Sequence, residues 1–184
     1  MVLTTSFAPT AMKLPLLPRL GVRLSLPARF DCLTWYGRGP HENYCDRQES
    51  ARVGVYSGSV QEQFVPYVKP QENGNKGDVR WATLTDGRGQ GLLAAGLPLF
   101  ACSAHHFTAE DFTGAPHLSD LKPRAETVLN LDWRQGGLGS NSCGPGVLPQ
   151  YQLLLEAPVE FAVRLRPFSR ETDDPMTLGR ARFG

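Results

Sequence analysis

The sequence has few cysteines, little net charge and no long apolar run. Its 184 residues carry a formal net charge of +1 at pH 7, so neither nucleic acid nor an anionic membrane is indicated as the main partner. No apolar stretch approaches the ~20 residues that cross a bilayer as a helix. Prolines at positions 9, 15 and 18 interrupt the N-terminal region, and we expect no secretory signal there.

The four cysteines, at positions 32, 45, 102 and 143, are widely spaced and form no Cys-x-x-Cys pair. A chain of this length with so few cysteines does not resemble a disulfide scaffold. We therefore expect free thiols in a reducing compartment, and a cytoplasmic location.

Glycine and proline are abundant, with 19 and 15 residues, which favours many turns and few long helices. Between the turns, apolar and polar residues alternate with the period of half-buried antiparallel strands. The alternation predicts strands at 21–30, 78–86, 126–134 and 159–167, with shorter candidates at 52–56, 60–66, 91–95, 99–107 and 150–155. The predicted fold class is all-β, an antiparallel β-sandwich.

Two segments depart from this pattern. One short helix is expected at 108–112, where Thr108 is a good N-cap and acidic residues occupy the first turn. Residues 168–184 are polar and lose the alternation, so the sequence predicts one domain over 1–167 followed by a disordered tail.

Three irregular segments between predicted strands are rich in Gly, Asn, Pro, aromatic and charged residues. They are WYGRGPHENYCDR (35–47), PYVKPQENGNKGDVRW (66–81) and LGSNSCGPGVLPQY (138–151). Loops on a rigid β scaffold often carry binding residues. Polar groups beside Trp and Tyr suit a sugar, whose hydroxyls need partners and whose CH faces stack on rings. Ordinary connections built from turn residues remain the alternative.

The residues give weaker support for a catalytic site or a metal site. A glycosidase needs two carboxylates at a set separation, and no spacing selects a pair from Glu42, Asp46, Glu72, Asp78 and Asp132. His105 and His106 are adjacent on a predicted strand, so they point to opposite faces and do not suit one metal ion. Cys143 has no histidine placed near it as a base. We therefore predict no catalytic residue and no metal ligand in this chain.

Several long blocks, in order along the chain, carry a specific resemblance. WYGRGPHENYCDR, VPYVKPQENGNKGDVRW, SAHHFTAEDF, LNLDWRQGGLGSNSCGPGVLPQY and FAVRLRP resemble the C-terminal small-chain domain, domain 5, of glycoside hydrolase family 2 β-galactosidases. The resemblance runs from about residue 14 to 167. It implies a β-sandwich of the galactose-mutarotase-like, supersandwich kind, which follows a catalytic (β/α)₈ barrel.

The resemblance also implies what this chain does and does not carry. The family's two catalytic glutamates lie on the barrel, and no part of this chain resembles the barrel. The implied role is to complete the galactoside-binding site of a separate barrel-bearing large chain, with no catalysis alone. The complete enzyme is implied to be an oligomer that uses Mg²⁺ and Na⁺, with no cofactor in this chain, no nucleic acid and no membrane as partners.

Four residues are implied to contact substrate. Glu72 and Asn73 belong to the Pro-x-Glu-Asn-Gly of a loop that the resemblance places near the galactosyl site. Ser142 and Cys143 lie where the best-known branch of the family has Ser-Trp-x-Pro, whose Trp stacks on the aglycone side. Cys143 replaces that Trp, which removes the flat stacking surface.

The family's domain is longer at its N-terminus, so we expect the sandwich to be incomplete on that side, with unpaired edges. The alternative function is a free-standing carbohydrate-binding or mutarotase-like β-sandwich. A mutarotase needs a His and a Glu placed across the sugar ring, and no such pair is evident in the sequence.

Overall fold

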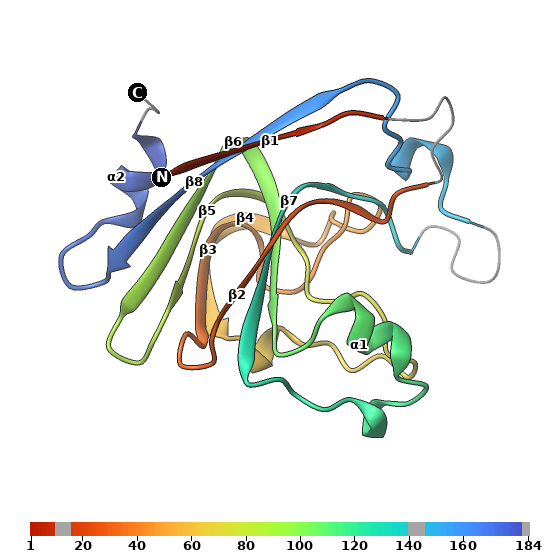
Figure 1. Ribbon diagram of the computed structural model, residues 1–184, viewed down its shortest axis with the longest axis horizontal. Helices are drawn as coiled ribbons and strands as arrows, with labels where there is room; N and C mark the ends of the chain where they lie inside the picture. The colour runs from red at the N-terminus through yellow and green to blue at the C-terminus, as the bar shows by residue number, and fades with distance from the viewer. Residues whose placement is uncertain (10–15, 140–145, 182–184) are drawn as a thin grey trace.

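A computed structural model of the protein describes residues 1–9, 16–139 and 146–181. In these ranges the chain forms eight strands and five short helices (Figure 1). The strands are β1 (Val2–Phe7), β2 (Arg19–Pro27), β3 (Cys32–Gly39), β4 (Arg52–Ser59), β5 (Lys76–Thr85), β6 (Gln90–His105), β7 (Glu126–Gln135) and β8 (Val159–Ser169). The helices are η1 (Gln61–Gln63), α1 (Ala109–Gly114), η2 (Leu118–Asp120), η3 (Pro149–Tyr151) and α2 (Pro175–Arg180). No helix in these ranges is long and apolar enough to cross a membrane.

All strand pairs are antiparallel and belong to one sheet, ordered β1-β8-β6-β5-β3-β4. The 16-residue β6 pairs with β8 through its first half and with β7 through its second half, and β7 in turn pairs with β2. The sheet therefore branches at β6. Figure 1 shows the two branches, β8 with β1 and β7 with β2, diverging from it.

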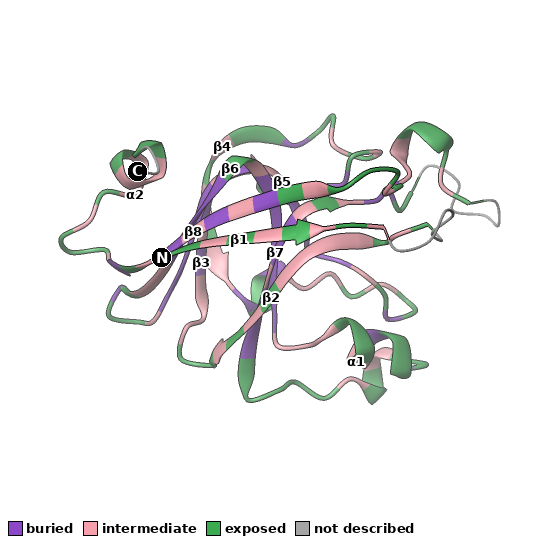
Figure 2. Cartoon of the chain, turned by 45° about the horizontal axis from the view of Figure 1, so that its top comes forward, coloured by how far each residue is buried: buried purple, intermediate pink, exposed green. Residues whose placement is uncertain are grey.

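The main core fills the inside of this branched sheet. Its largest side chains come from five strands and are almost completely buried: Trp35, Leu84, Phe100, Leu131 and Phe161. Side chains of β1 and β2 cover the core as partly buried residues. Buried positions concentrate on the central strands, while the helices and loops are mostly half-buried or exposed (Figure 2). The all-β antiparallel fold class is confirmed.

A second apolar cluster lies on the outer face of β5. Trp81, Leu93 and Phe168 are buried there beneath Met176 and Leu178 of α2. The indole Nε1 of Trp81 lies 3.3 Å from Met176 Sδ. Both faces of β5 are therefore buried, whereas the alternation predicts one polar face.

The long periodic strands and the short helix are predicted correctly. The segments 21–30, 78–86, 126–134 and 159–167 correspond to β2, β5, β7 and β8, and Thr108 caps α1 with a reciprocal hydrogen-bond pair to Asp111. The separate candidates 91–95 and 99–107 form one strand, β6.

Other sequence expectations need correction. Residues 60–66 and 150–155 contain η1 and η3 in place of strands, because Gln61–Gln63 and Pro149–Tyr151 each close a tight turn of 3₁₀-helix. The sequence predicts no strand between 31 and 51 and treats 35–47 as irregular, whereas β3 occupies Cys32–Gly39. A Cβ at Gly37 would lie 2.9 Å from Val79 Cγ2, so glycine allows close strand contact here.

The expected disordered tail also differs from the structure. Phe168 is buried in β8, and α2 follows with Asp174 as its N-cap, accepting from the backbone N–H groups of Met176 and Thr177. Because α2 packs on Trp81, its order depends on a tertiary contact that polarity does not reveal. Only 182–184 of this segment lie outside the described residues.

Candidate functional site

The irregular segments identified in the sequence meet at one place in the fold, which we call the loop cluster (residues 41–48, 65–77 and 136–139). Asn43 and Asn75 join the first two segments: Asn43 N donates to Asn75 O, and Asn75 Nδ2 donates to Asn43 O, each at 2.8 Å. The Asn43 Oδ1 accepts from Gly77 N at 2.8 Å. These backbone groups are thus paired outside any regular strand ladder.

Glu42 is the buried acid that ties the second segment to the first. Its carboxylate accepts from Arg47 Nη2 at 2.6 Å, from Gly74 N at 2.7 Å and from the Tyr67 hydroxyl. Burial, together with the hydrogen bond to Glu42, raises the pKa of Tyr67. Arg47 also donates to Tyr67, so the acid, the phenol and the guanidinium form one closed group.

Glu72, a predicted substrate-binding residue, lies in a second buried ionic group. Arg19 Nη1 is 3.0 Å from Glu72 Oε2, and Arg19 Nη2 is 2.5 Å from Asp132 Oδ2. Burial raises the pKa of Asp132 and of Glu72, and the Arg19 charge partly opposes both shifts. The second oxygen of Glu72, Oε1, has no hydrogen-bond partner among the described residues. In this structure Glu72 therefore anchors its loop to β2 and β7.

Asn73, the second predicted residue of this loop, is also engaged. Its Oδ1 accepts from Val65 N at 3.0 Å, and its Nδ2 donates to Gln71 O at 2.9 Å. The next residue, Gly74, has φ +75°, and a Cβ there would lie 2.6 Å from the His105 ring. The Asn-Gly pair therefore shapes the loop, because asparagine closes it and only glycine suits the following position.

The third segment is held by Asp46. Its carboxylate accepts from Leu138 N at 3.1 Å and from Gly139 N at 2.7 Å. The Cys45 thiol lies beside it, 3.8 Å from Gln135 O and 3.7 Å from Tyr151 O. Ser142 and Cys143, the other two predicted substrate-binding residues, lie outside the described residues, so their roles stay predictions.

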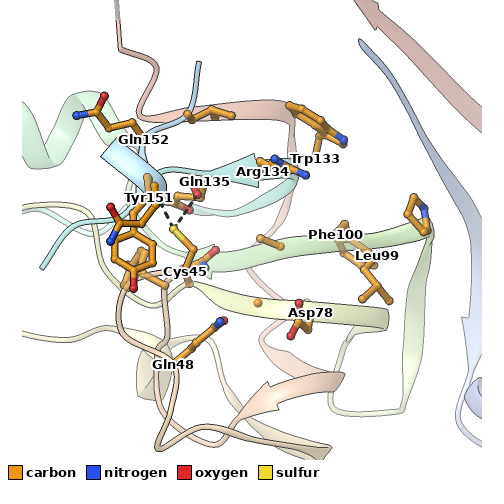
Figure 3. Close-up of a pocket in the computed structure, with 17 residues that line it drawn as sticks. Cys45, Gln48, Asp78, Leu99, Phe100, Trp133, Arg134, Gln135, Tyr151 and Gln152 are labelled. Carbon is orange, nitrogen blue, oxygen red and sulfur yellow. Dashed lines mark hydrogen bonds between the residues drawn. The ribbon is translucent and has the colours of Figure 1, made fainter. Parts of the chain in front are cut away.

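A cavity of about 460 Å³ opens beside the loop cluster, and we call it the Trp133 cavity. Residues of the cluster and of β5, β6, β7 and η3 line it, among them Tyr44, Asn75, Asp78, Trp133, Gln135 and Tyr151. Figure 3 shows Cys45 next to Gln135 and Tyr151, with Gln48 and Asp78 across the cavity from Trp133.

Burial shifts the pKa values of three titratable groups beneath the loop cluster in the direction that favours their uncharged forms. Burial lowers the pKa of His105 to about 4 and of Lys76 to about 8, and it raises the pKa of Cys102 to about 12. Lys76 Nζ lies 5.1 Å from the centre of the Trp35 ring and donates to Gly74 O. Within the described ranges, no three His, Cys, Asp or Glu side chains form a group that could hold a metal ion.

Sequence reasoning missed the side chains that bind the buried acids. Arg19 precedes the first predicted strand and binds an acid 113 positions away, and Tyr67 and Arg47 reach Glu42 from two segments. No local pattern marks such pairs. The Glu, Asn and Gly content of the segments indicated where the chain is irregular, but not which side chains are already bound.

Comparisons with known proteins find one matching family and several relatives. The family described as "Beta galactosidase small chain" matches residues 2–165. A β-galactosidase of Priestia megaterium is 40% identical over 141 residues, which cover 77% of this chain and 14% of that protein. A β-galactosidase of Arthrobacter sp. is 40% identical over 162 residues, covering 84% and 16%. β-Galactosidase BgaC of Bifidobacterium adolescentis is 37% identical over 159 residues, covering 84% and 15%.

This chain therefore corresponds to a small part of those relatives, between 14% and 16% of their lengths. The family match, by contrast, covers most of the chain, including β1 to β7 and the loop cluster. The chain belongs to the β-galactosidase small-chain family.

Proposed function

We propose that the chain completes the galactoside-binding site of a separate, barrel-bearing β-galactosidase chain of glycoside hydrolase family 2, and that it does not catalyse hydrolysis alone. The observation that carries the proposal is the family match over residues 2–165, in a chain that spans about a seventh of its relatives. A part of that size needs a larger partner region to supply the chemistry.

The environment of the buried acids supports a positioning role. Hydrolysis of a glycoside uses two carboxyl groups about 5–5.5 Å or about 6.5–9.5 Å apart, and one of them must exchange a proton with substrate or water. Glu42, Glu72 and Asp132 are each held by an arginine within the loop cluster or at its base. These contacts favour fixing the loops over proton transfer to a sugar.

The mutarotase-like alternative is less well supported. It requires a histidine that reaches a sugar, and His105, the histidine packed against the loop cluster, is not available because it is buried with its Nε2 2.9 Å from Asn73 O. We assign galactoside contact in the complete enzyme to the surface that Glu72, Asn73, Ser142 and Cys143 help to form. For Glu72 and Asn73 the proposed contribution is the shape of the loop.

The same proposal covers the metal ions, the oligomeric state and the location of the complete enzyme. The Mg²⁺ and Na⁺ that the resemblance implies for the complete enzyme are proposed to lie outside this chain. The complete enzyme is proposed to be an oligomer. Cys32, Cys45 and Cys102 are free thiols, which supports a reducing, cytoplasmic location.

Reconstitution tests the proposal. The Priestia megaterium relative, truncated to remove the region that this chain matches, is co-expressed with the 184-residue chain, and hydrolysis of a nitrophenyl galactoside is measured. We expect activity from the pair and none from either part alone. Asn43→Ala, which removes the acceptor of Gly77 N, is expected to lower the recovered activity, whereas Gln71→Ala at an exposed position is not. Turnover by the purified chain alone would sink the proposal.

A further inference from the structure

Met176 joins helix α2 to the outer face of the sheet. Its Sδ lies 3.3 Å from Trp81 Nε1, and the residue is half-buried, so small solutes in the solvent can reach its side chain. A thioether is apolar and polarisable, and its contact with an aromatic ring is favourable. Helix α2 lies beyond residues 2–165, to which the family match extends, so this contact is a feature of the chain that the family match does not cover.

The position of α2 depends on very few side chains. The helix has six residues, too few to be stable in water without tertiary contacts. Met176 and Leu178 are the residues of α2 that pack against the apolar cluster around Trp81, and Arg164 of β8 donates to Leu178 O and Ala181 O. One of the two apolar anchors of α2 is therefore a methionine, whose sulfur can be oxidised.

The helix covers one part of an apolar row that crosses the outer face of the sheet. Trp81 lies opposite Tyr36 of β3, and Tyr36 lies opposite Val55 of β4. Residues directly opposite one another on antiparallel strands present their side chains to the same face. Trp81, beneath α2, is 2% exposed, whereas Val55, at the uncovered end of the row, is 53% exposed. Departure of α2 would therefore extend the exposed row from Val55 to Trp81.

Oxidation of Met176 by a peroxide would remove the contact that holds α2. The thioether sulfur attacks one oxygen of hydrogen peroxide, the O–O bond breaks, and the products are the sulfoxide and water. A sulfoxide is polar, and burying a polar group without a hydrogen-bond partner is unfavourable. The separation of 3.3 Å between sulfur and indole nitrogen leaves no room for an oxygen between these atoms. The oxidised side chain is therefore more stable in water than on Trp81.

We propose that Met176 is an oxidation site that controls α2: the thioether holds the helix on Trp81, and the sulfoxide releases it and uncovers the row of Trp81, Tyr36 and Val55. Methionine sulfoxide reductases reverse this modification, so the released state can be restored. The proposal concerns the outer face of the sheet and does not rest on the galactoside-binding role or on a barrel-bearing partner.

Treatment of the full chain with hydrogen peroxide tests the proposal. The tryptic peptide 171–180 contains Met176 as its only methionine, so mass spectrometry measures oxidation at this residue. A Trp133→Phe background leaves Trp35 and Trp81, which are 1% and 2% exposed, so an increase in acrylamide quenching reports the uncovering of Trp81. With Met176 oxidised, we expect severalfold stronger quenching and a melting temperature lower by about 2–4 °C. A methionine sulfoxide reductase is expected to reverse both changes.

Met176→Leu is the matched control. It keeps an apolar side chain of similar volume and the two other methionines but has no sulfur at 176, so peroxide is expected to leave its quenching and melting temperature unchanged. An equal peroxide effect in this variant and in the wild type would overturn the proposal. Sulfoxide at 176 without a change in quenching would also overturn it, as would a Met176 that stays reduced while Met1, 78% exposed, is oxidised. Reversal by the reductase uses Met176 itself, so the test does not depend on the folding of the leucine variant.

Discussion

His105 shows how one buried side chain links the loop cluster to the core. Its Nε2 lies 2.9 Å from Asn73 O, and its ring packs edge-on against Phe112 at a centroid distance of 5.7 Å. Burial lowers the pKa of His105 from 6.5 to about 4, the hydrogen bond to Asn73 opposes this, and the charges of Lys76 and Arg19 add to it. The folded protein therefore resists protonation at a position that supports the Glu-Asn-Gly loop.

This shift predicts how stability depends on pH. Between pH 6.5 and about 4 the unfolded chain binds a proton at His105 that the folded chain does not, so stability falls as the pH falls through this window. The contribution is complete above about pH 6.5, and its loss by pH 4 is on the order of 3 kcal/mol. Urea unfolding from pH 7.5 to pH 4 measures it.

The matched variants for this prediction are His105→Gln and His117→Gln. The glutamine at 105 removes the titration, so the free energy of unfolding is expected to vary less with pH across the window. His117 is exposed, and its replacement is expected to leave the wild-type slope unchanged. Equal slopes in the wild type and in His105→Gln would contradict the assignment of the pH dependence to His105.

At the scale of elements, α2 is a six-residue helix that is stabilised mainly by what it covers. Met176 and Leu178 lie over Trp81, and a Cβ at Gly179 would lie 2.4 Å from Trp81 Cδ1. Glycine at 179 therefore lets the helix backbone approach the indole. Arg164 Nη1, on β8, donates to Ala181 O just after the helix.

Gly179→Ala is expected to destabilise the protein, against the usual trend for helices. In an exposed helix, alanine stabilises by about 1 kcal/mol relative to glycine. Here the added methyl group collides with Trp81, and such overpacking costs roughly 1–3 kcal/mol. We expect a lower melting temperature and greater quenching of Trp81 fluorescence. Gly114→Ala, at the end of α1 where a Cβ meets nothing within 4 Å, is the control and is expected to be neutral or stabilising.

The elements also show what the sequence could predict. Strands β2, β5, β7 and β8 have clear alternation, because each presents one face to the main core. The sequence predicts no strand at β3, because Gly37 and Gly39 interrupt its alternation at places where neighbouring residues come too close for a side chain. Helix α2 was missed because its stability comes from Trp81, 95 residues away from Met176. The three loop segments were found by composition, but the pairing of Arg19 with Asp132 depends on topology.

At the scale of the whole molecule, the branched sheet leaves strands at its ends. Strand β4 ends the order and pairs only with β3 among the described strands. Val53 and Val55 on this strand are 44% and 53% exposed. An edge strand with apolar side chains and free backbone groups is a template for pairing with another chain. The edge of β4 is therefore the surface of this chain at which we expect strand pairing.

We therefore expect the purified chain to self-associate through β4, to a degree that rises with protein concentration. Val55→Lys places a charge on the edge and is expected to shift the sedimentation profile toward monomer, because edge lysines disfavour strand pairing. The melting temperature should change little, since Val55 is half exposed and outside the core. Val68→Lys is the matched control, as Val68 is 94% exposed in the 64–75 connection and not on a strand edge. Self-association that is equal in the wild type and in Val55→Lys would show that another surface is responsible.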